Sequence, residues 1–211
     1  MKKTIRGLIL DMGGVLTLPQ REDKVRELMG VMGQGGGPEP FLAAYYEKRR
    51  EYDRGDLDRR AYWTGVAEAL GAPPPGPAID ELARVDLESW FNMRPRMIEL
   101  VRALRARSRA LVLLSNIHHD GARYVRSGEG RAWSSAFDEL VLSCEHRLAK
   151  PEAEIYGIAV RAANASAGEC LFVDDSEANV EGARRAGLES FRFVDEADFE
   201  ERLERDYALA R

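Results

Sequence analysis

Short apolar runs, each followed by polar or Gly-containing residues, are the clearest pattern in this chain. Five such runs occur: Ile5 to Leu10, Ala110 to Leu114, Glu139 to Leu142, Cys170 to Val173 and Ser190 to Val194. Runs of this length, rich in Val, Leu, Ile and Phe, are typical of buried parallel strands. The pattern therefore predicts a parallel sheet.

Helical patterns separate the later four runs. Pro95 to Arg107 begins with a proline in its first turn and places apolar residues on one stripe. Helices are predicted by the same kind of pattern at Pro151 to Ala163 and at Ser176 to Ala186. The second of these ends before Gly187, which is expected to cap it. The alternation of strands and helices predicts an α/β fold with a doubly wound, Rossmann-like parallel sheet. Such sheets bind ligands at the carboxyl ends of their strands.

The stretch from Leu18 to Asn92 breaks this alternation. It contains no convincing strand and reads as three or four amphipathic helices, separated by Gly- and Pro-rich segments at 34–38 and 72–77. A helical insertion directly after the first strand would lie over the ligand-binding edge of the sheet as a lid. We therefore expect a core domain made of residues 1–17 and 93–211, and a small helical cap made of residues 18–92.

Composition narrows the class of protein. The chain has 211 residues, 45% of them hydrophobic, and a formal net charge of −5, which argues against nucleic-acid binding. No apolar run approaches the roughly 20 residues that cross a bilayer, so no membrane association is expected. The first apolar run is short and ends at Asp11, which disfavours a signal peptide and predicts a cytoplasmic protein. Two cysteines and three tryptophans at apolar positions are expected to be packing residues.

Carboxylates follow two of the predicted strands. Asp11 ends the first run and is followed by Gly13 and Gly14, which would let backbone groups approach a ligand closely. Asp174 and Asp175 end the fourth, and two adjacent acids repel each other unless a cation or donors compensate. Asp11 could equally form an Asx turn, and the acidic pair could charge a helix N-terminus. We favour a metal at the acidic pair.

Two further strands end in groups that can bind an anion. Ser115 and Asn116 follow the second run and could donate to phosphoryl oxygens, or cap the next helix. Lys150 precedes Pro151 at a helix start and could bring a point charge to an anion, or lie solvated on the surface.

The four groups form a coherent set when taken together. Mg²⁺ prefers one or two protein carboxylates together with waters and substrate phosphate oxygens. Phosphoryl transfer depends mainly on positioning and charge neutralisation, which a hydroxyl, an amide and a lysine supply.

In this combination the chain resembles the haloacid dehalogenase superfamily of aspartate-nucleophile phosphatases. The insertion after the first motif resembles that family's helical cap of the C1 type. The segments 11–15, 150–156 and 174–179 are most similar to bacterial sugar-phosphatase-like members and to the phosphatase domain of soluble epoxide hydrolases.

The resemblance implies an aspartyl-phosphate mechanism with Mg²⁺ as cofactor. Asp11 would be the nucleophile and a metal ligand, the carbonyl of Gly13 and the carboxylate of Asp175 would be further ligands, and Asp174 would bind directly or through water. Asp11 would attack phosphorus in line, and water would then hydrolyse the intermediate.

The resemblance also implies how the substrate is held. Ser115 and Asn116 would hold the transferring phosphoryl group, Lys150 would neutralise it and orient Asp11, and Asn179 would lie near the substrate. The substrate would be a small phosphorylated metabolite such as a sugar phosphate, hydrolysed by a monomer or a homodimer.

One position departs from the pattern of the family. Most of its phosphatases carry a second Asp two residues after the nucleophile as general acid and base, and here that position is Gly13. General acid–base help contributes roughly 10²–10⁴-fold in rate. The substrate could have a good leaving group, or a residue of the cap or of His118-His119-Asp120 could substitute. Alternatively, catalysis is weak or lost and the fold binds a phosphometabolite.

A dehalogenase is a further alternative. Haloacid dehalogenases lack the second Asp and need no metal. They have no need of paired Asp174 and Asp175, however, so the acidic pair favours phosphate chemistry.

Overall fold

A five-stranded sheet forms the centre of the molecule. The computed structural model describes residues 2–106 and 110–209, so the predicted helix end at Arg107 lies outside the described residues. The strands are β2 (Gly7–Leu10), β3 (Ala110–Ser115), β4 (Glu139–Leu142), β5 (Cys170–Asp174) and β6 (Glu189–Arg192). Their order is β4-β3-β2-β5-β6, and all neighbours run parallel. The predicted doubly wound α/β sheet is confirmed.

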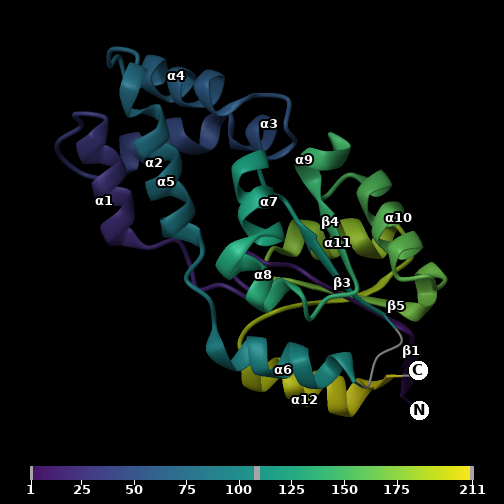
Figure 1. Cartoon of the computed structure of the whole chain (residues 1–211). Helices are drawn as coiled ribbons and strands as arrows, with labels where there is room; N and C mark the ends of the chain where they lie inside the picture. Colours follow the sequence, from purple (N-terminus) through teal and green to yellow (C-terminus); the bar gives the residue numbers. More distant parts are fainter. Residues whose placement is uncertain (1, 107–109, 210–211) are drawn as a thin grey trace.

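Helices cover both faces of this sheet (Figure 1). Leu8 and Leu10 of β2 belong to one hydrophobic cluster and Ile9 to another, as the two-residue repeat of a strand requires. The first cluster contains side chains of α6 (Pro95–Arg105) and α12 (Glu196–Asp206). The second contains side chains of α10 (Ala153–Ala162) and α11 (Glu177–Arg185). The strands are buried on both sides, which explains why they are almost wholly apolar.

The first predicted strand is two strands in the structure. β1 (Lys3–Ile5) pairs in parallel with β7 (Tyr207–Leu209), whereas β2 begins at Gly7 in the large sheet. The last predicted strand also ends early, at Arg192 instead of Val194. Neither boundary can be read from hydrophobicity, because both depend on which distant segment supplies the hydrogen bonds.

Residues 18–92 form a separate helical unit. It contains α1 (Glu22–Val31), α2 (Glu39–Glu47), α3 (Arg49–Asp53), α4 (Arg59–Ala69) and α5 (Ile79–Trp90), whereas three or four helices were predicted. Their apolar side chains pack in a cluster of their own, distinct from the clusters on the sheet. The chain leaves and re-enters the core at an antiparallel bridge between Thr17 and Met93. These features support the division into a core and a cap, which stays a prediction.

The connection between β3 and β4 carries α7 (His119–Arg126) and α8 (Gly128–Ser134), and α9 (Ser143–His146) follows β4. Short 3₁₀ turns at Gly76–Ala78 and Ala167–Glu169 precede α5 and β5. Figure 1 shows the helical unit beyond α7 and α9, on the side of the sheet where β2 and β3 end. Among the described residues, no helix is both long and apolar enough to cross a bilayer.

Candidate active site

The predicted groups meet at the carboxyl ends of the central strands. Asp11 follows β2, Ser115 ends β3 and Asp174 ends β5, and β2 is hydrogen-bonded to both of the other strands. Parallel strands present their carboxyl ends at one edge, so residues about 100 and 160 positions apart become neighbours.

Lys150 joins two of the carboxylates. Its ammonium nitrogen lies 2.5 Å from Asp11 Oδ1 and 2.7 Å from Asp174 Oδ2, and its side chain is almost wholly buried. Burial alone would lower the pKa of Lys150, but the charges of Asp11 and Asp174 raise it. Lys150 is therefore a fixed cation inside the site and not a solvated surface lysine.

Both carboxylate oxygens of Asp174 accept hydrogen bonds. Oδ1 accepts from the backbone N–H of Ser176 at 2.8 Å and from Asn179 Nδ2 at 3.0 Å. Oδ2 accepts from Lys150 and, at 3.1 Å, from the same Asn179 amide. Asp174 thus holds Lys150 and Asn179 in place, whereas the neighbouring Asp175 is exposed. This bonding favours the through-water alternative for Asp174.

The carboxylates fit a divalent cation. One oxygen each of Asp11, Asp174 and Asp175 lie within 4.8 Å of one another. The three carboxylates outnumber the single ammonium of Lys150. The pKa of Asp11 is raised to about 8, mainly by burial and next by the charge of Asp174, although Lys150 acts to lower it. Hard oxygen ligands and a net negative charge are what Mg²⁺ requires.

The side chain of Asn116 contacts the backbone of Lys150. Its Oδ1 accepts from the Lys150 N–H at 2.8 Å, and its Nδ2 donates to the Lys150 carbonyl at 3.1 Å. Asn116 therefore positions Lys150, in addition to the predicted contact with the phosphoryl group, which stays a prediction. Ser115 is buried, and its hydroxyl donates to the Asn116 carbonyl over a long 3.4 Å.

The two glycines after Asp11 differ in their surroundings. A Cβ built on Gly14, whose φ is 69°, would overlap the carboxylate of Asp175, so only glycine allows this approach. A Cβ on Gly13 would meet no atom within 4 Å. A larger side chain would therefore fit at Gly13, so steric crowding does not explain why this position lacks an acid.

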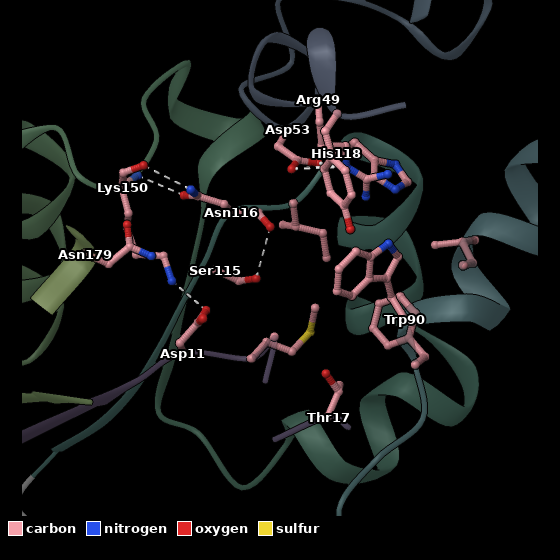
Figure 2. A pocket seen from close by; sticks show the side chains of 16 residues that line it. Asp11, Thr17, Arg49, Asp53, Trp90, Ser115, Asn116, His118, Lys150 and Asn179 are labelled. Atoms are coloured by element: carbon pink, nitrogen blue, oxygen red, sulfur yellow. Dashed lines mark hydrogen bonds and ion pairs between the residues drawn. The ribbon is translucent and has the colours of Figure 1, made fainter. Parts of the chain in front are cut away.

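A cavity of about 180 Å³ lies between these strand ends and the helical unit (Figure 2). The core lines it with Asp11, Met12, Gly13, Thr17, Ser115, Asn116, Ile117, His118, Lys150 and Asn179. The helical unit and its exit line it with Tyr46, Arg49, Asp53, Leu87, Trp90 and Phe91. Six of the eight residues predicted for the site are among these residues, and the other two, Asp174 and Asp175, lie next to Asp11.

The sequence did not single out Arg49, a polar side chain that the helical unit brings to the cavity. Arg49 is partly buried, with 13% of its side chain exposed. Its Nη1 lies 3.1 Å from Asp86 Oδ2, and its Nε lies 3.1 Å from Asp53 Oδ1. Trp90, expected only to pack, lines the cavity and donates its indole N–H to Tyr45 Oη at 2.9 Å. In the sequence, Asp86 lies on the same helical stripe as the apolar Ile79, Leu82 and Ala83. An acid on an apolar stripe is a signal that could have pointed to a buried partner for it.

The adjacent histidines have different environments. His118 is 2% exposed, lines the cavity and places Nε2 3.3 Å from Asp86 Oδ2. His119 is exposed on the first turn of α7. One of the two thus belongs to the cavity wall.

Comparison with known proteins identifies the family. The model of the haloacid dehalogenase-like hydrolases matches residues 5–187, which include every group described above. The chain belongs to this family. The strand ends with Asp11, Ser115 and Asp174 lie within the part of the chain that matches the family.

Several haloacid dehalogenase-like relatives match the chain over most of its length. A sesquiterpene phosphatase of Aspergillus oryzae is 24% identical, over 92% of this chain and 93% of the relative. A D-ribitol-5-phosphate phosphatase of Bacteroides thetaiotaomicron is 23% identical, over 94% and 97%. A haloacid dehalogenase family enzyme of the same bacterium, solved with magnesium and inorganic phosphate, has a TM-score of 0.71 at 22% identity and covers 92% of this chain and 98% of its own.

Proposed function

We propose that this chain is a magnesium-dependent phosphatase that hydrolyses a small phosphate ester through an aspartyl-phosphate on Asp11. The observation that supports this most is the contact of one buried ammonium, that of Lys150, with both Asp11 and Asp174, beside the exposed Asp175. Relatives that match over nine-tenths of the chain are phosphatases, and one relative binds magnesium with inorganic phosphate.

Each residue of the site has a separate role in this proposal. Lys150 contacts Asp11 Oδ1, which fixes the orientation of the nucleophilic carboxylate and offsets the charge of an incoming phosphate. Ser115 and Asn116 lie at the end of the neighbouring strand, where their donors can hold phosphoryl oxygens. Asp174 keeps Lys150 and Asn179 in place.

Asp11, the Gly13 carbonyl and Asp175 would hold Mg²⁺, with Asp174 one water away. When bound, the ion neutralises charge between the carboxylate nucleophile and the phosphate. Attack of an Asp11 oxygen on phosphorus breaks the bond to the leaving group, and water then cleaves the acyl phosphate to release orthophosphate and restore Asp11.

The cavity favours a small leaving group that can contact both polar and apolar walls. Its volume of about 180 Å³ lies below the usual range of pockets for drug-sized ligands. Arg49, Asp53 and His118 line its far end with charged or polar groups, while Trp90 and Phe91 add an apolar wall. A polyol or sugar phosphate suits such walls, as does the substrate named for the Bacteroides relative.

Phosphate release tests the proposal. Purified protein would be assayed on anomeric and primary sugar phosphates, ribitol 5-phosphate, acyl phosphates and 4-nitrophenyl phosphate, each with Mg²⁺ and with EDTA. Turnover that needs Mg²⁺ and disappears in Asp11→Asn is expected, together with a phosphorylated Asp11 in acid-quenched protein by mass spectrometry. Halide release from a 2-haloacid without phosphate release from any ester would instead make the chain a dehalogenase.

A further inference from the structure

The proposed phosphatase needs a proton for its leaving group, and Gly13 has none to give. An alkoxide is a poor leaving group, and general acid help is worth roughly 10²–10⁴-fold. A proton donor must come from another group on the cavity wall. In-line displacement places the leaving oxygen on the side of phosphorus opposite Asp11.

Figure 2 shows Arg49, Asp53 and His118 together at one end of the cavity and Asp11 at the other. His118 precedes α7 and follows Ser115 by three residues, so its backbone is tied to the phosphate-binding strand end. His118 therefore belongs to the core, while its side chain contacts Asp86 and Tyr52 of the helical unit.

Two contacts fix the imidazole of His118. Nε2 lies 3.3 Å from Asp86 Oδ2, and the ring stacks on Tyr52 with centroids 4.3 Å apart and planes 9° from parallel. Nδ1 is buried and has no hydrogen-bond partner among the described residues. A carboxylate that anchors one ring nitrogen and leaves the other for a reacting group is the arrangement that general acid–base histidines use.

Arg49, Asp53 and Asp86 form a network of ion pairs next to His118. Arg49 carries a permanent positive charge and contacts two carboxyl groups, those of Asp86 and Asp53. Burial would raise the pKa of Asp86, but Arg49 and His118 outweigh it and lower the pKa to about 2, so Asp86 stays ionised.

The other polar groups at this end are less suited to proton transfer. Arg49 cannot lose a proton at any working pH. Both oxygens of Asp53 accept from Arg49 Nε, at 3.1 and 3.2 Å. Trp90 gives its N–H to Tyr45, and Tyr46 gives its hydroxyl proton to Gln20. His118 is left as the group that can release and regain a proton.

We propose that His118, anchored by Asp86, is the general acid and base of this enzyme, in the role left open at Gly13. As the bond from phosphorus to the leaving oxygen breaks, that oxygen takes the proton from Nδ1 of the imidazolium. The neutral Nδ1 then accepts a proton from the water whose oxygen attacks phosphorus, while the bond to Asp11 breaks. This inference rests on the proposed phosphatase function.

The experiment compares two esters that differ in their need for a proton. Ribitol 5-phosphate leaves as an alkoxide, whereas 4-nitrophenyl phosphate leaves as a stabilised phenolate. His118→Gln keeps an amide N–H for Asp86 but cannot transfer a proton. We expect it to lower kcat on ribitol 5-phosphate by roughly 10²–10⁴-fold and to keep the rate on 4-nitrophenyl phosphate within about threefold. His119→Gln, on the exposed neighbour, should leave both rates unchanged.

The outcomes separate the hypotheses. Equal losses on both esters in His118→Gln, in protein that circular dichroism shows to be folded, would make His118 structural and overturn the inference. A leaving-group-selective loss in Asp53→Asn with none in His118→Gln would also overturn it, because the donor would be Asp53. If His118→Gln does not fold, His118→Asn would take its place. Wild-type protein that releases phosphate from neither ester would refute the proposed function itself.

Discussion

The carboxamide of Asn116 forms hydrogen bonds to both backbone polar groups of Lys150, at 2.8 and 3.1 Å. Asn116 follows β3, and Lys150 follows α9, so this pair ties the loop that carries the lysine to the neighbouring strand end. The ammonium of Lys150 can reach Asp11 and Asp174 together only if its backbone is held in this place.

Asn116→Ala is therefore expected to lower kcat by about 10- to 100-fold while the protein remains folded. Removing both hydrogen bonds would let Lys150 move, and a displacement of about 1 Å at a reacting group can cost about 100-fold. Steady-state kinetics with saturating Mg²⁺ measure the effect. Asn164→Gly removes a carboxamide from an exposed turn and should leave kcat unchanged. Full activity in Asn116→Ala would show that the Lys150 loop holds its place unaided.

Magnesium should stabilise the fold. Three carboxylates lie together and the ammonium of Lys150 contacts two of them, so the ion would bind the native arrangement and not the unfolded chain. At 100 times its Kd a ligand adds about 2.7 kcal/mol to the free energy of unfolding. Thermal denaturation with Mg²⁺ and with EDTA measures the shift. Asp175→Asn should lose most of it, while Asp80→Asn, an exposed acid of α5, should keep it. An unchanged shift in Asp175→Asn would remove that residue from the metal site.

Asp86→Asn should strongly destabilise the protein. The carboxylate is fully buried and accepts from Arg49, Tyr45 and His118. The neutral amide therefore removes the more deeply buried of the two carboxyl partners of Arg49 and leaves Asp53 as the other. Removing one partner of a buried ion pair costs about 3–5 kcal/mol. Urea denaturation measures the loss. Asp80→Asn, on the same helix but 82% exposed, should change the free energy of unfolding by less than about 0.5 kcal/mol.

The same carboxylate should make stability depend on acid pH. The pKa of Asp86 is lowered from 3.8 to about 2 in the folded state, so the unfolded chain binds more protons between these values. Its contribution is complete above about pH 4 and is lost as the pH falls towards about 2. Urea midpoints measured across this window should fall more steeply for wild type than for Asp86→Asn. Parallel curves for the two proteins would contradict the assignment.

Gly14→Ala should weaken the metal site. The added Cβ would overlap the Asp175 carboxylate and would also force alanine to a φ of 69°. Displacing a group that sets the geometry of a metal site typically costs about 10- to 100-fold in metal affinity. The Mg²⁺ concentration that gives half-maximal activity measures this. Gly71→Ala, with φ of 63° and open space around its Cβ, reports the backbone cost alone and should leave Mg²⁺ dependence unchanged.

The sequence was sufficient to predict which side chains the strand ends bring together. Each apolar run is a local signal, and parallel strands in one sheet bring their carboxyl ends to one edge. Asp11, Ser115 and Asp174 could therefore be placed together without knowledge of any contact between them. Lys150 and the helical insertion after the first strand were found in the same way, by their position relative to a strand.

Only the tertiary structure decided the contacts between elements that no local pattern relates. Asn116 bonds to the Lys150 backbone, Arg49 pairs with Asp86, and Asp86 of the helical unit contacts His118 of the core. These contacts join residues 32 to 37 positions apart. Hydrophobic periodicity tells which face of a helix is buried, but not which distant polar group completes its hydrogen bonds. The grouping of Asp11, Ser115 and Asp174 followed from the sequence, whereas the contacts among Arg49, Asp86 and His118 depended on how the helical unit packs on the sheet.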